Sequence, residues 1–184
     1  SIVDGSRKMV NSFGGSIELE ELFKKILAID DTDEALSMLA AAEGNARRFA
    51  AERFEQRAVR ADSLLRYAAA MEMPMNVTSE DIDAARRRLS EGEREAAWAD
   101  ISACMERMMA PFELRFNEGR RDIDDLVARA ASAGVKVPAL TELLNEGEEA
   151  LRHEDAGQAL ELLHRAEKER SVALSSAIAV RIEE

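Results

Sequence analysis

Apolar residues recur at steps of three and four along much of the chain. The clearest run lies between residues 36 and 68, where Arg and Glu fill most of the positions in between. Its predicted buried positions are Leu36, Leu39, Ala42, Ala46, Ala50, Phe54, Ala58, Ala61, Leu65 and Ala68. This spacing predicts a long helix with a narrow apolar stripe. The alternation that a half-buried strand needs appears nowhere, so we expect an all-α fold.

The sequence also repeats itself at a fixed offset of 62 positions. The matching segments are 31–39, 93–101 and 155–163. In the same register, Phe54 falls on Phe116 and then on Ile178, without any insertion. Self-similarity at a fixed spacing indicates a repeat architecture. Each period is interpreted as a short helix, a tight turn and a very long helix, and we expect an elongated array of three such units.

The period predicts boundaries along the chain. They separate an N-terminal segment at 1–16, a first repeat at 17–78, a second at 79–140 and a truncated third at 141–184. Residues 1–10 match the end of a long helix one period later. The N-terminal segment is therefore interpreted either as the tail of a preceding repeat helix or as an ordinary arm, and the chain as a piece of a longer array.

Pro111 falls inside the long segment of the second repeat. A proline in a helix interior removes a hydrogen bond and costs ~3 kcal/mol. The repeat register is nevertheless the same on both sides of it. Trp98 matches Leu36 before the proline, and Phe116 matches Phe54 after it. We therefore expect one kinked helix rather than two helices with a linker at 108–114.

Two known architectures resemble this pattern. One turn is similar to the helix-to-helix turn of tetratricopeptide repeats through Ala159, Leu160, Leu163 and Ala166. Those repeats recur at about 34 residues, and a period of 62 departs from that. The long helices are more similar to spectrin-type repeats, in which one helix runs from one bundle into the next. This resemblance covers nearly the whole chain without signature residues, and it implies a spacer or docking surface.

Charge and composition narrow the range of functions. The 184 residues have a formal net charge of −12, which disfavours a nucleic-acid binder, since that needs clustered Lys and Arg. A single cysteine excludes an intrachain disulfide. No apolar run approaches the roughly 18 residues of a spanning helix, and no signal peptide is recognisable. A cytoplasmic location is expected on these grounds.

Candidates for chemistry are few. Glu161 and His164 have the Glu-x-x-His spacing of di-iron bundles, but no second such pair stands at the repeat positions. His153 lies at a turn, and Cys104 takes a small-residue position of the apolar stripe. Gly14-Gly15 lacks the lysine of a phosphate-binding loop. We therefore predict no catalytic residue, no cofactor and no metal, and a protein that is not an enzyme.

An interaction surface is the remaining candidate site, and its predicted residues are Arg53, Arg57, Arg60, Met73, Met75 and Met109. The arginines share one helix face, where acidic neighbours favour a salt-bridged solvent surface over an anion site. The methionines lie near repeat junctions, where core filling is favoured over an adaptable binding surface. The partners would be other proteins, self-association included, and a membrane surface stays open.

The leading hypothesis is a non-enzymatic helical scaffold or spacer for protein–protein interaction. The alternative is a partner-binding or membrane-surface regulatory module with an exposed apolar patch. The predicted anchors of the internal seam are Leu36, Trp98, Leu160, Phe54, Phe116 and Ile178.

Overall fold

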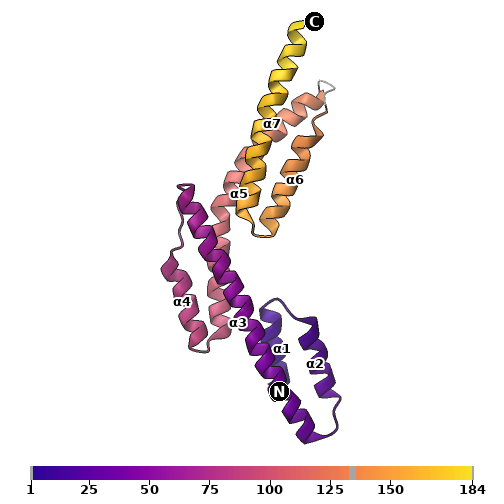
Figure 1. Ribbon diagram of the computed structural model, residues 1–184, viewed down its shortest axis with the longest axis vertical. Helices are drawn as coiled ribbons and strands as arrows, with labels where there is room; N and C mark the ends of the chain where they lie inside the picture. The colour runs from indigo at the N-terminus through magenta and orange to yellow at the C-terminus, as the bar shows by residue number, and fades with distance from the viewer. Residues whose placement is uncertain (1, 133–135, 184) are drawn as a thin grey trace. The chain divides into compact units, whose positions relative to one another are not determined.

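The computed structural model describes the backbone of residues 2–132 and 136–183 and the side chains of residues 3–132 and 136–171. Within these ranges every regular element is an α-helix (Figure 1), which confirms the expected all-α fold. The helices are α1 (Ile2–Ser12), α2 (Ile17–Leu27), α3 (Thr32–Ala70), α4 (Ser79–Ser90), α5 (Arg94–Ser132), α6 (Pro138–Arg152) and α7 (Ala156–Glu183).

The helix bounds follow the sequence period closely. The helices α3 and α5 both have 39 residues, or about 58 Å at the α-helical rise. The helices α3, α5 and α7 begin at positions 32, 94 and 156, and each start is one period after the one before. α2 and α4 begin where the first and second repeats were predicted to begin, whereas α6 begins at Pro138, three residues before the predicted boundary. We call residues that are one or two whole periods apart counterparts.

The chain divides into two compact units. Unit 1 comprises Ser1–Leu65 with Val77–Met105, and unit 2 comprises Arg66–Asn76 with Glu106–Glu184. Two of the three divisions fall inside a long helix, one in α3 and one in α5, and the third lies in the connection between α3 and α4. These units group residues that are close in space, and the repeat boundaries stay a prediction.

Unit 1 has an apolar core between α1, α2 and the first half of α3 (Figure 1). Its buried members are Val3, Val10, Leu19, Phe23, Ile26, Ala42 and Ala46. Alanines on α3 let the shorter helices approach its backbone closely, while Phe23 fills the space between them. The connection from α1 to α2 turns at Gly14 and Gly15, whose φ values of 97° and 74° favour glycine.

The predicted stripe on α3 is largely confirmed. Phe54 and the six predicted alanines are fully buried. The three leucines of the predicted stripe are not buried, because Leu39 and Leu65 are half-buried and Leu36 is exposed. Leu64, at 6% exposure, is buried in place of Leu65, because both leucines lie close to the stripe and the neighbouring helices select one of them. Leu36 is 57% exposed, so it does not anchor a seam among the described residues.

In unit 2, α6 and α7 lie side by side (Figure 1) and pack with the second half of α5. The approach between α5 and α6 is close at Gly147. A Cβ added there would lie 2.4 Å from Cε2 of Phe116, so only glycine leaves room for the ring. Gly119 likewise faces Leu163 of α7, with 2.8 Å from an added Cβ to Cδ2. Phe116 is fully buried, as predicted.

The helix α5 passes through Pro111 without interruption. The expectation of one helix across residues 108–114 is therefore confirmed. Pro111 has no N–H to donate to the carbonyl four residues earlier, and the helix is maintained by packing on both sides. Phe112 and Phe116, which follow it, are fully buried.

Two of the matching sequence segments form the same local structure. The Asp31 carboxylate accepts hydrogen bonds from the backbone N–H groups of Asp33 (2.9 Å) and Glu34 (3.0 Å), which caps α3. Asp155, two periods later, accepts one from the N–H of Gln158 at 3.0 Å and caps α7. The aspartates that revealed the period are therefore helix caps.

Candidate interaction surface

The three predicted arginines lie on one face of α3 within unit 1. Arg53 and Arg60 are exposed and Arg57 is half-buried. The Arg57 guanidinium lies over the Trp98 ring at 5.4 Å from its centroid. Arg53 lies over the Phe49 ring at 5.8 Å. Cation–π contacts of this kind hold the arginine stems against the helix surface, so two of the three arginines contribute to packing inside the unit.

Trp98 is the centre of a small junction in unit 1. Its ring is half-buried and lies 4.7 Å from the Phe13 ring, centroid to centroid, at an interplanar angle of 37°. Three residues before it, Glu95 lies 3.9 Å from the ammonium of Lys8. These contacts join the start of α5 to the end of α1. Phe13 is fully buried at this junction.

The predicted methionines divide between surface and core. Met73 and Met75 are half-buried, next to Met71, which is 50% exposed. Met109 is only 5% exposed. Its place in the candidate surface is thus wrong, because the side chain fills core space beside the equally buried Met105 and Met108.

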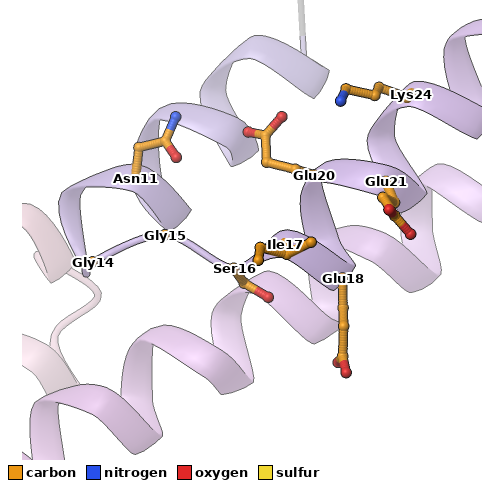
Figure 2. A pocket seen from close by; sticks show the side chains of 9 residues that line it. All are labelled: Asn11, Gly14, Gly15, Ser16, Ile17, Glu18, Glu20, Glu21 and Lys24. Carbon is orange, nitrogen blue, oxygen red and sulfur yellow. The ribbon is translucent and has the colours of Figure 1, made fainter.

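A groove of about 770 Å³ opens between α1 and α2 (Figure 2). It is lined by Asn11, Gly14, Gly15, Ser16, Ile17, Glu18, Glu20, Glu21 and Lys24. Arg7 donates to Glu20 at 2.7 Å, and this bond holds the pKa of the Glu20 carboxyl below its ordinary value. The Ser16 hydroxyl accepts from the N–H of Leu19. The acidic side chains of this lining lie in the first turns of α2. Negative charge there interacts favourably with the positive end of the helix dipole.

Ion pairs attach the short helices to the long ones. In unit 1, Arg86 of α4 donates to Asp62 of α3 at 2.8 Å and lies 3.4 Å from Glu55. In unit 2, Arg120 of α5 donates to Glu148 of α6 at 2.7 Å. This bond lowers the pKa of the Glu148 carboxyl and raises that of the Arg120 guanidinium. The sequence hypothesis of salt-bridged arginine faces had not singled out these two pairs.

The side chains considered for chemistry include two exposed histidines and one buried cysteine. The His164 side chain is 81% exposed and lies 3.8 Å from Glu167. His153 is 3.1 Å from Glu149 at the end of α6. Cys104 is buried, as predicted for a small-residue position. Among the described residues, no group of three or more His, Cys, Asp or Glu is placed to hold a metal ion. In the same residues, no helix has both the length and the apolarity to cross a membrane.

The turn between α2 and α3 exposes two leucines that the sequence interpretation did not assign to a surface. Leu27, the last residue of α2, is 63% exposed, and Leu36 in the first turns of α3 is 57% exposed. The counterparts of Leu36 are better covered, because Trp98 is half-buried and Leu160 is 7% exposed. This exposed surface could be found only by comparing the burial of the three counterparts. The sequence alone does not give that burial.

No protein-family model, no curated protein and no solved structure matches the chain.

Proposed function

We propose that this chain is a non-enzymatic helical scaffold built from three repeats, with a period of 62, in a spectrin-like, elongated array. In such arrays each unit buries its apolar stripe against its neighbours. The stacked units form a long structure with an extended surface. The chain would act as a spacer that presents docking surfaces to other proteins.

One observation supports this proposal most strongly. The helices α3 and α5 have the same number of residues, and the starts of α3, α5 and α7 are spaced by one period. Phe54 and Phe116, at the same place in the two equal helices, are both fully buried. A repeated unit accounts for all three features together.

Deletion of one whole period tests the proposal. Removal of residues 32–93 joins Asp31 to Arg94 and leaves a short helix followed by a long one in the original register. If the units are interchangeable, this variant should remain helical and unfold cooperatively. Circular dichroism would measure both properties. A spacer further predicts a smaller maximum dimension in small-angle X-ray scattering.

The matched control removes residues 32–79, which breaks the register at the junction. We expect this variant to lose cooperative unfolding. Equal behaviour of the two deletions, or an unchanged maximum dimension after removal of 32–93, would contradict a modular spacer.

A further inference from the structure

The turn between α2 and α3 combines apolar and acidic side chains at the surface. Leu27 and Leu36 are the apolar members, both more than half exposed. Asp30, Asp33 and Glu34 lie between them in the sequence and are also at the surface. We call these five residues the turn surface. Exposed leucines at adjoining helix ends within an acidic rim are typical of a place where another protein surface binds.

The counterpart of this region shows what covers it. One period later, the position of Leu36 is taken by Trp98, which packs on the Phe13 ring and under the Arg57 guanidinium. The position of Asp33 is taken by Glu95, which pairs with Lys8. The start of a long helix is thus covered by an apolar residue that follows the end of an earlier helix, with a cation beside it.

The chain contains a second residue suited to this covering role. Phe13 has its counterpart two periods later in Val137, which lies between the end of α5 and the start of α6 and is half-buried. Lys136 precedes it and is exposed. An apolar residue that directly follows a cation, Lys136, therefore matches the apolar and acidic turn surface in chemistry.

We propose that the turn surface binds Val137 and the neighbouring Lys136, just before α6, of a second copy of this chain, head to tail. Leu36 would take the place that Trp98 has against Phe13, and Asp33 would pair with Lys136. The proposal rests on the repeat architecture, since it extends the internal register from one copy to the next. A contact between two different surfaces generates open chains of copies rather than closed dimers.

Sedimentation velocity of the full chain tests the association. The wild-type mass is expected to rise above the 20.3 kDa of one chain with concentration. Leu36→Asp should weaken self-association at least tenfold, because it places a charge in the contact. Leu114→Asp is the matched control, because Leu114 on α5 is 62% exposed and outside the proposed contact. A wild type that keeps the mass of a single chain, or equal losses in both variants, would overturn the proposal.

Cross-linking tests the register. In a Cys104→Ala background, chains with Leu36→Cys and chains with Val137→Cys are oxidised separately and as a mixture. Alanine stands at both counterparts of Cys104, so the background substitution suits the fold. Head-to-tail binding predicts a covalent dimer in the mixture alone. Dimers of Leu36→Cys alone would show a two-fold contact and refute this register.

These experiments separate the two proposals. A chain that tolerates deletion of one period but stays monomeric would keep the scaffold and remove self-association. A chain that associates through Leu36 but loses its fold on removal of 32–93 would refute interchangeable repeats and leave the contact itself in place.

Discussion

The contact of α4 with α3 in unit 1 and that of α6 with α5 in unit 2 each contain an ion pair, and its member on the short helix stands at the same sequence position with opposite charge. In unit 1 the cation, Arg86, is on the short helix and its acidic partner is on the long one. In unit 2 the anion, Glu148, is the counterpart of Arg86, and the long helix supplies Arg120. The positions of the apolar residues agree, whereas the polarity of the ion pair is reversed.

This difference shows which interactions fix the register. Phe54 and Phe116 are counterparts and both are fully buried. Ala85 and Gly147 on the short helices are counterparts as well, and both are buried. Apolar packing depends on volume and shape, so it allows few substitutions. An ion pair at a helix surface needs only opposite charges within reach and contributes little to stability, so its polarity can reverse.

Truncation of the two phenylalanines should have the largest effect. We expect Phe54→Ala and Phe116→Ala each to lower the free energy of unfolding by about 3–5 kcal/mol, the usual cost of removing a buried ring. Denaturant unfolding followed by circular dichroism would measure both. Leu114→Ala, at an exposed apolar position, is the control and should change little. A loss in the free energy of unfolding below about 1 kcal/mol at either phenylalanine would show that the two contacts are not equivalent.

Gly147→Ala should have an intermediate effect and should distinguish the two contacts. The new Cβ would lie 2.4 Å from the Phe116 ring, and overpacking of this kind costs about 1–3 kcal/mol. Gly44→Ala is the matched control, because a Cβ at this exposed helical position meets nothing within 4 Å. It should stabilise the protein by about 0.5–1 kcal/mol.

The same change in a Phe116→Leu background should cost less, because the smaller side chain leaves room for the methyl group. A cost that is equal in both backgrounds would show that the ring does not limit this approach. Denaturant unfolding measures all four variants on one scale.

The ion pair of unit 2 should have the smallest effect, and that effect should depend on pH. The bond from Arg120 lowers the folded pKa of Glu148 below its unfolded value. The stabilisation is therefore complete above the unfolded pKa of about 4.3 and is lost as the pH falls through the folded pKa. Arg120→Ala should lower Tm at pH 7, and its difference from wild type should shrink towards pH 3. Arg121→Ala, at the exposed neighbouring position, should show no such trend.

The helices were predictable from the sequence to a large extent. Steps of three and four placed the stripe of α3, because a helix surface repeats with that spacing whatever packs on it. The period located the turns, since aspartates at 31 and 155 cap helices in the same way. A continuous α5 could also be predicted, because an inserted linker at Pro111 would have shifted the register.

The surface was harder to predict, because exposure depends on what other segments cover. Leu36 and Leu160 occupy the same place in the sequence pattern, yet one is exposed and the other is buried. Met109 was included in the candidate surface although core filling was favoured for the junction methionines, and it is buried. Arg57 was predicted by its spacing, but its position over Trp98 depends on a separate helix that begins only at Arg94.

The aromatic residues of the chain have one practical consequence. Its only tryptophan, Trp98, belongs to unit 1, and its only tyrosine, Tyr67, belongs to unit 2, where it stacks on Phe112 at 5.8 Å. Burial raises the pKa of the Tyr67 hydroxyl above its ordinary value, so phenolate absorbance also responds to folding there. Each half of the molecule thus contains its own intrinsic chromophore, and loss of structure in either can be followed spectroscopically in a single unlabelled sample.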